Sequence, residues 1–330
     1  MKKAVNFHAV AGFSAKDPGG NIRALHNLLK CFLVSFVYLV VTNRMKIDLN
    51  GFETATLTAT DGTTIAYRYT GNGPPLILVH GALQSSLNFT RLAKALSGDF
   101  TVFIPDRRGR GLSDGYSESD DRITEAKDIL TLAQSTGAAN IFGLSSGAII
   151  TLQAALLDPA IQRIALYEPP IPLDKDTFEK LDIDYERAIS EGNLGRAFAA
   201  ILKGTGNTSF FTRLPTFILT PLFNFLMEKQ AKKSGENELA LRDLVPTFHH
   251  DRIVTQGAAQ LITDAKRLQT QVLLMHGSES KAFLKRPLDQ LAITVGHASR
   301  VEFKKQGHLA ADNSGDPLKV AATLLRFFKQ

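Results

Sequence analysis

Short, mainly apolar runs recur along this chain, and each is bounded by Gly, Pro or polar residues. Such runs are typical of strands that are buried on both faces of a sheet. The expected strands are, in chain order, 75–79, 100–104, 140–142, 161–167, 271–276 and 300–303. Segments with a helical pattern lie between or after them, at 124–134, 148–157 and 317–328. Strands that alternate with helices predict an α/β fold, with a mostly parallel, twisted sheet covered by helices on both faces.

The alternation is interrupted between the strands at 161–167 and 271–276. No strand signal occurs there, and helical patterns separated by breaks are found instead at 177–190, 194–202 and 217–233. We therefore expect a helical insertion at 171–268, with residues 45–170 and 269–330 forming the α/β core. The many Phe and Leu side chains of the insertion either line the roof of an apolar pocket or simply pack the insertion onto the core.

Charge separates the first 44 residues from the rest of the chain. They contain six Lys or Arg and a single Asp, and so carry +5 of the formal net charge of +6. The remainder is close to neutral, which argues against a nucleic-acid partner. Residues 28–41 are apolar except for Lys30 and Ser35, and this run is shorter than the ~20 residues that span a bilayer.

Three interpretations of residues 1–44 compete. The segment is an uncleaved signal or membrane anchor, it is a hydrophobic helix docked on the domain, or it is absent from the mature protein because translation starts at Met45. The third is favoured and predicts a cytoplasmic protein, whereas the first predicts a membrane-anchored or exported one. Membrane contact is then expected through 28–41, with docking through 217–227 as the weaker alternative. No pattern in the chain predicts an oligomeric state.

A G-x-S-x-G run at 143–147 lies between the strand that ends at Phe142 and the helix that starts near Ala148. This is the pattern of a nucleophile elbow, a tight strand-to-helix turn that presents a serine hydroxyl at the end of a buried strand. Three further motifs accompany it: His80-Gly81 after the strand at 75–79, a D-x-R-G-x-G-x-S run at 106–113, and Gly307-His308 after the last strand.

With these four motifs the chain resembles the α/β-hydrolase fold family over residues 53–330. The resemblance implies a helical cap at 171–268 and a serine nucleophile, Ser145, with His308 as its base. It also implies an oxyanion hole formed by the backbone N–H groups of Ala82 and Ser146. His80 and the charged run that begins at Asp106 are expected to be mainly structural.

The acid of the triad departs from the family pattern. The family usually places an aspartate in a G-x-x-D turn after the strand at 271–276, but here the turn reads Gly277-Ser-Glu-Ser280. Glu279 is the favoured acid because it lies one residue before that aspartate position and its side chain is longer. Glu168, at the end of the preceding strand, is the alternative, since haloalkane dehalogenases of the family keep a glutamate there.

A serine nucleophile favours hydrolysis of a small apolar carboxylic ester, thioester or lactone through an acyl-enzyme. A carbon–carbon hydrolase, a cofactor-free perhydrolase and a non-catalytic small-molecule-binding relative are the alternatives.

No cofactor or metal is expected. The single cysteine, Cys31, excludes an intramolecular disulfide and a cysteine-based metal cluster. The run His249-His250-Asp251 is interpreted as cap structure or pocket lining, because adjacent helical residues point in different directions.

Overall fold

The computed structural model describes residues 47–330 apart from 175–176, 206–213 and 233–238. The chain divides into two compact units, Met1–Arg44 and Met45–Gln330, and the second is described below. The expectations about residues 28–41 lie outside the described residues. Among the residues that are described, no helix is both long enough and apolar enough to cross a membrane.

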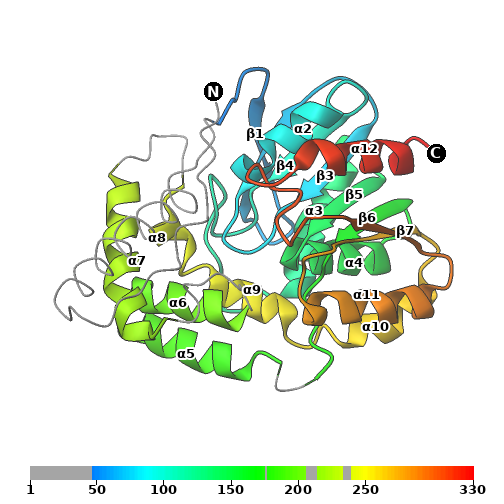
Figure 1. The fold of residues 1–330 in the computed structure, drawn as a ribbon. Coiled ribbons are helices and arrows are strands. Elements are labelled where there is room, and N and C mark those ends of the chain that lie inside the picture. The colour runs from blue at the N-terminus through cyan, green and yellow to red at the C-terminus, as the bar shows by residue number, and fades with distance from the viewer. Residues whose placement is uncertain (1–46, 175–176, 206–213, 233–238) are drawn as a thin grey trace, which may run out of the picture. The chain divides into compact units, whose positions relative to one another are not determined.

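Eight strands form one sheet in the order β1-β2-β4-β3-β5-β6-β7-β8 (Figure 1). Their bounds are β1 Glu53–Thr58, β2 Thr64–Thr70, β3 Pro75–Val79, β4 Thr101–Pro105, β5 Asn140–Leu144, β6 Arg163–Tyr167, β7 Gln271–Gly277 and β8 Ser299–Phe303. The strand β2 runs antiparallel to both β1 and β4, and all later pairs are parallel. The predicted α/β fold and its mostly parallel sheet are therefore confirmed.

Helices cover both faces of the sheet. They are α2 Thr90–Leu96, α3 Arg122–Thr136, α4 Ser146–Leu157, α11 Ala282–Val295 and α12 Pro317–Phe328. In β3, Ile77 and Val79 pack with α3, α4 and α11, whereas Leu76 and Leu78 pack with α2 and α12 on the other face. Because successive strand residues point to opposite faces, a strand covered on both sides must be apolar at every position. This explains the wholly apolar run at 75–79.

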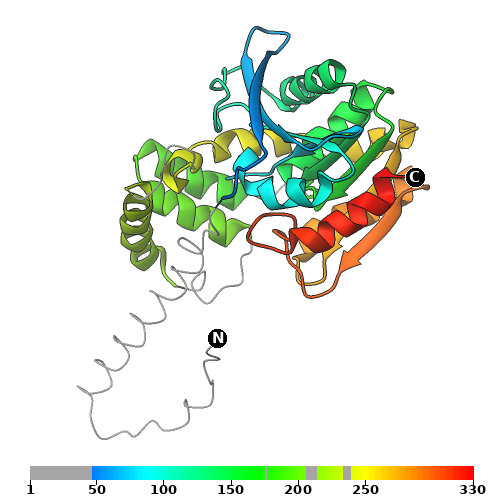
Figure 2. The same cartoon turned by 90° about the horizontal axis from the view of Figure 1, so that it is seen from above.

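The helical insert comprises the helices between β6 and β7. They are α5 Glu179–Ser190, α6 Leu194–Gly204, α7 Thr216–Ala231, α8 Leu241–Leu244, α9 Phe248–Thr255 and α10 Gln260–Asp264, followed by the 3-10 turn η4 Ala265–Arg267. Helices α5, α6 and α7 pack on one another beside the core, and α9 packs on α3 and α4 (Figures 1 and 2). The insert thus contacts the core through α9, α10 and the η4 turn, since α10 and η4 both pack on α4 and α11.

The apolar side chains of the insert divide into two groups. Phe198 and Phe223 are buried and pack edge to face, with ring centroids 5.1 Å apart. In contrast, Phe217 and Phe225 are 77% and 59% exposed on the outer side of α7. Packing therefore accounts for the first pair, and neither packing nor a pocket roof accounts for the second.

A sharp turn joins β5 to α4 at Ser145, whose backbone has φ +58° and ψ −126°. This conformation is costly for any residue other than glycine and persists only where the surroundings enforce it. Gly147 allows the close approach that the turn needs, because a Cβ there would lie 2.4 Å from the carbonyl oxygens of both Val79 and His80. The elbow is therefore wedged against the end of β3.

Replacing Gly147 with Ala is expected to lower the free energy of unfolding by about 2 kcal/mol or more, because two backbone carbonyls would have to move. Urea denaturation followed by circular dichroism measures this. Gly98→Ala is the matched control, since a Cβ at Gly98 meets nothing within 4 Å. Equal unfolding midpoints for the two variants would contradict the packing described for the elbow.

Candidate active site

Ser145 lies at the carboxyl end of β5, beside the end of β6. Its backbone N–H donates to the carbonyl oxygen of Tyr167 at 2.9 Å. Its side chain faces the loop after β3, because a Cβ on Gly81 would lie only 2.8 Å from the Ser145 Cβ. Ser145 is partly exposed. It lies at the edge of the sheet where the parallel strands end, which is the usual place for a site in such a sheet.

The carboxylate beside His308 belongs to Glu168, which directly follows β6. His308 Nδ1 and Glu168 Oε2 are 2.7 Å apart, and the Glu168 side chain is fully buried while that of His308 is 31% exposed. The other carboxylate oxygen of Glu168 accepts a hydrogen bond of 2.7 Å from the backbone N–H of Gly277. The hydroxyl of Tyr167 donates to the carbonyl oxygen of Gly307 at 2.9 Å. The Glu168 carboxylate and the loop that carries His308 are thus both fixed.

The structure therefore brings the alternative acid, Glu168, and not the favoured Glu279, to His308. The side chain of Glu279 is exposed. Its backbone N–H donates to the carbonyl oxygen of Gln306 at 2.9 Å, and the turn closes with Ser280 N–H on the carbonyl oxygen of Gly277 at 3.2 Å. These bonds hold the turn after β7 beside the loop that carries His308, while the exposed Glu279 side chain makes no hydrogen bond or ion pair with His308 in the described part of the chain.

His80 holds the loop that follows β3. Its Nε2 accepts a hydrogen bond of 3.2 Å from the backbone N–H of Arg107, so the ring is neutral and its Nδ1–H donates to the carbonyl oxygen of Gly81 at 3.0 Å. Burial, together with the nearby charges of Arg110 and Arg107, lowers the pKa of His80 well below its usual value. His80 is a fixed structural group, and the structure agrees with the role expected for it.

The two N–H groups expected in the oxyanion hole belong to Ala82 and Ser146. Neither has an acceptor among the residues that the structure describes. The loop around Ala82 is tied down by Gln84, whose Oε1 accepts from Gly81 N–H at 2.8 Å and whose Nε2 donates to Asp312 at 2.7 Å. Since Asp312 lies shortly after His308, one chain of hydrogen bonds connects the histidine loop to the loop after β3.

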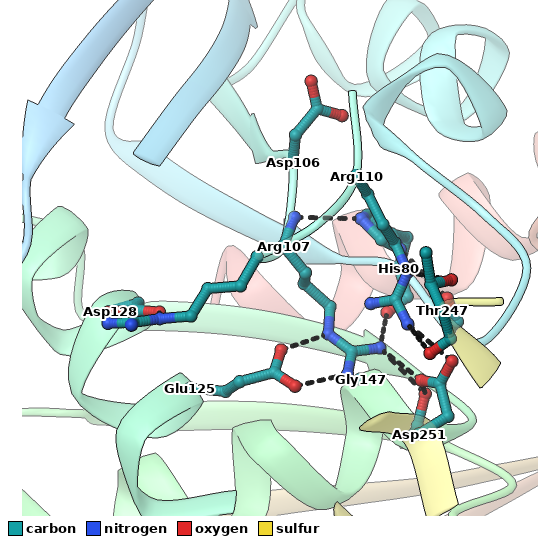
Figure 3. A network of polar contacts seen from close by, with 12 residues as sticks. His80, Asp106, Arg107, Arg110, Glu125, Asp128, Gly147, Thr247 and Asp251 are labelled. Carbon is teal, nitrogen blue, oxygen red and sulfur yellow. Dashed lines mark hydrogen bonds and ion pairs between the residues drawn. The ribbon is translucent and has the colours of Figure 1, made fainter. Parts of the chain in front are cut away.

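A buried network of charges lies behind the elbow (Figure 3). The guanidinium of Arg107 binds both carboxylate oxygens of Glu125, at 2.6 and 2.8 Å, and Asp251 Oδ1 at 2.9 Å. Arg110 Nη2 binds Asp251 Oδ2 at 2.5 Å. Two cations face two carboxylates, so their charges balance, and α9 of the insert is bound to the core through Asp251. Ser146 Oγ also joins the network, at 2.7 Å from Asp251 Oδ1.

The remaining charged residues of this loop tie neighbouring segments together. Asp106 is fully buried and accepts from Arg68 Nη1 at 3.0 Å and from the backbone N–H of Ser86 at 2.7 Å. Arg108 binds Asp128 with two hydrogen bonds of 2.7 and 2.8 Å. These contacts agree with the mainly structural role that was expected of the charged run at 106–113.

A family model described as alpha/beta hydrolase fold matches residues 74–314. The chain belongs to the α/β-hydrolase family.

Three relatives illustrate what this α/β hydrolase is similar to. It is 24% identical over 279 residues, 74% of this chain and 85% of the relative, to the 3-hydroxybutyrate-oligomer hydrolase of Cupriavidus necator. It is 34% identical over 108 residues, 32% of this chain and 40% of the relative, to the N-formylmaleamate deformylase of Pseudomonas putida. A solved α/β hydrolase from Sphaerobacter thermophilus shares 27% identity with a TM-score of 0.65, covering 83% of this chain and 100% of that one. The protein is thus a hydrolase, and the expectation of an enzyme of this family is confirmed.

The run His249-His250-Asp251 of this α/β hydrolase has three separate sets of partners. His249 Nδ1 lies 2.6 Å from Glu186 Oε1, the His250 ring stacks on Tyr116 with centroids 3.4 Å apart, and Asp251 joins the buried network. Among the described residues no group of three potential ligands converges on one point. The interpretation of this run as part of the insert's structure agrees with these contacts.

His250 of this α/β hydrolase makes folding sensitive to acid. Burial, with smaller contributions from His249 and Arg110, lowers its pKa from 6.5 to about 4. Between these two values the unfolded chain binds a proton that the folded protein does not, so stability falls as the pH falls from 6.5 towards 4. We expect the melting temperature to drop between pH 7 and pH 5, and to drop less in His250→Phe, which keeps the stacking but cannot titrate. An equal drop in both proteins would contradict this assignment.

Proposed function

We propose that this hydrolase cleaves a small, apolar carboxylic ester through an acyl-enzyme on Ser145, with His308 as the base and Glu168 as the acid. The observation that carries the proposal is the 2.7 Å contact between His308 Nδ1 and the fully buried Glu168 carboxylate. A buried carboxylate in this position holds the ring so that its Nε2 is free to accept a proton, and stabilises the imidazolium that results. The strained elbow that presents Ser145 supports the same assignment.

The proposed reaction has two halves. His308 Nε2 takes the proton of Ser145 Oγ as the oxygen attacks the ester carbonyl carbon, and the carbonyl oxygen becomes an oxyanion that accepts hydrogen bonds from the N–H groups of Ala82 and Ser146. The intermediate collapses, the alcohol leaves with the proton from His308, and the acyl group remains on Ser145. Water then attacks the acyl-enzyme in the same way, and the carboxylic acid is released.

The relatives support the ester as substrate class without fixing its acyl group. The relative from Cupriavidus necator is named for the hydrolysis of 3-hydroxybutyrate oligomers, in which a short hydroxy acid is linked to itself. The relative from Pseudomonas putida is named a deformylase, which keeps amide hydrolysis as a second candidate. Thioester or lactone hydrolysis, carbon–carbon cleavage and perhydrolysis would use the same serine and histidine.

We also propose that the insert acts as a cap over Ser145, with the cap at 171–268 and the core at 45–170 and 269–330. The position of α5 to α10 between β6 and β7 supports this.

A small-molecule substrate and the absence of a nucleic-acid partner fit the near-neutral charge of the chain after residue 44. The protein is proposed to be cytoplasmic if it starts at Met45, and membrane-anchored or exported through 28–41 otherwise. Mass spectrometry of the native N-terminus distinguishes these cases.

The proposed activity is tested with p-nitrophenyl esters of increasing acyl length, from acetate to octanoate. We expect turnover that depends on Ser145 and that passes through a maximum at the chain length that fills the acyl pocket. No Ser145-dependent turnover of any ester by the folded protein would overturn the ester assignment and favour the amide or carbon–carbon alternative.

A further inference from the structure

Asp251 connects the insert to the residue that follows the proposed nucleophile. It lies on α9, is only 2% exposed, and all of the hydrogen bonds of its carboxylate come from the core. Ser146 Oγ and Arg107 Nη1 donate to Oδ1 at 2.7 and 2.9 Å, and Arg110 Nη2 donates to Oδ2 at 2.5 Å (Figure 3). Ser146, whose backbone N–H is proposed to bind the oxyanion, is therefore part of this network.

The hydroxyl of Ser146 both donates and accepts a hydrogen bond. Its hydroxyl proton goes to Asp251 Oδ1, and its oxygen accepts from Arg107 Nη1 at 2.9 Å. Ser146 is 1% exposed and is the first residue of α4, so its own N–H has no partner within the helix. A hydroxyl fixed by two charged groups leaves the peptide between Ser145 and Ser146 little freedom to rotate.

The strained backbone of Ser145 makes such a restraint useful. A residue at φ +58° relaxes unless neighbouring contacts hold it there. Relaxation of the turn would rotate the Ser146 N–H away from the point where negative charge develops, and oxyanion-hole donors act only when they are already aimed at that point. The tether on Ser146 Oγ opposes this rotation from the far side of the helix terminus.

We propose that Asp251 is a positioning residue for the oxyanion hole, which sets the direction of the Ser146 N–H through the Ser146 hydroxyl. The inference rests on the proposed hydrolytic function of Ser145. It assigns a second role to the insert, because docking of α9 on the core then completes the catalytic geometry as well as covering the site. A hydrolase in which α9 has separated from the core would retain Ser145, His308 and Glu168 but would stabilise the transition state less well.

Ser146→Ala is the cleanest test, because it removes the tether but leaves the N–H, Arg107 and Asp251 in place. Asp251→Asn is less clean, since an amide donor would face Arg110, whose Nη1 already lacks a partner among the described residues and whose charge would then be unpaired. We expect Ser146→Ala to lower kcat by about 10- to 100-fold with KM nearly unchanged, because an oxyanion-hole donor contributes about 10²- to 10³-fold and a misdirected one loses part of this.

The matched control is Thr247→Val, which removes the 3.2 Å hydrogen bond from Arg110 Nε to Thr247 Oγ1. It weakens the same junction between insert and core without touching Ser146, and its kcat is expected to stay within about twofold of the wild type.

A second measurement uses a phenylboronic acid, whose tetrahedral adduct on Ser145 places an oxygen in the oxyanion hole. Its inhibition constant should rise in Ser146→Ala by the same factor by which kcat falls.

The outcomes separate the two proposals. If the wild type turns over esters in a Ser145-dependent manner and Ser146→Ala has the same kcat and boronate affinity, the positioning role is overturned and the hydrolytic function stands. A loss of melting temperature in Ser146→Ala with unchanged kcat would likewise assign the tether to stability alone. If no Ser145-dependent turnover exists, the proposed function and this inference fall together.

Discussion

Ser145→Ala is expected to lower kcat for the preferred p-nitrophenyl ester by about 10⁴-fold or more, because the neighbouring hydroxyl of Ser146 is buried and bonded to Asp251 and so does not replace Ser145 in forming the acyl-enzyme. The fold should be unaffected. Ala and Ser have the same Cβ and meet the same strain at this turn, where φ is +58°. Steady-state kinetics on protein purified in parallel with the wild type measures the change.

The control for this variant is its circular dichroism spectrum and melting temperature, which should match those of the wild type. Residual activity of about one part in ten thousand is compatible with the proposal, since substrate binding and the oxyanion hole still act on water. A kcat within tenfold of the wild type in a folded Ser145→Ala protein would exclude Ser145 as the nucleophile.

Glu168→Gln is expected to lower kcat by about 10³- to 10⁴-fold with little change in KM. The Gln oxygen can still accept the hydrogen bond from Gly277 N–H, which leaves the amide NH₂ facing His308 Nδ1. That nitrogen must then accept, so the ring carries its proton on Nε2 and can no longer take one from Ser145. The loss therefore arises from the tautomer of His308, and the position of the ring is retained.

Glu279→Gln is the matched control for Glu168→Gln, because it makes the same chemical change at the acid that the sequence favours. Its side chain is exposed, and its kcat is expected to stay within about twofold of the wild type. The reverse result, in which Glu279→Gln is inactive and Glu168→Gln is active, would show that the turn after β7 rearranges to deliver Glu279 to His308.

Much of the fold could be predicted from sequence because its signals are local. Strands such as β3 are covered on both faces, so every position is apolar and the run is visible without knowing its neighbours. The antiparallel pair β1 and β2 was not predicted, since β1 has no buried residue and its threonines resemble a loop. Ser145 and His308 were found because each lies in a short motif with a defined place after a strand.

The acid of the triad could not be chosen from sequence, because the choice depends on the direction of a turn. Glu168 and Glu279 both follow parallel strands, and only the contact of 2.7 Å between Glu168 Oε2 and His308 Nδ1 in the folded protein shows which one lies beside His308. The network around Asp251 was equally hidden. Asp251 is 144 positions from Arg107, and no pattern in either segment indicates that they meet.

Activation of Ser145 by His308 is measured by labelling the folded protein with a fluorophosphonate and locating the adduct by peptide mass spectrometry. We predict one adduct, on Ser145, formed rapidly in the wild type and at least about 100-fold more slowly in His308→Ala. An adduct on another residue, or equal labelling rates with and without the His308 imidazole, would contradict the activation of Ser145 by His308.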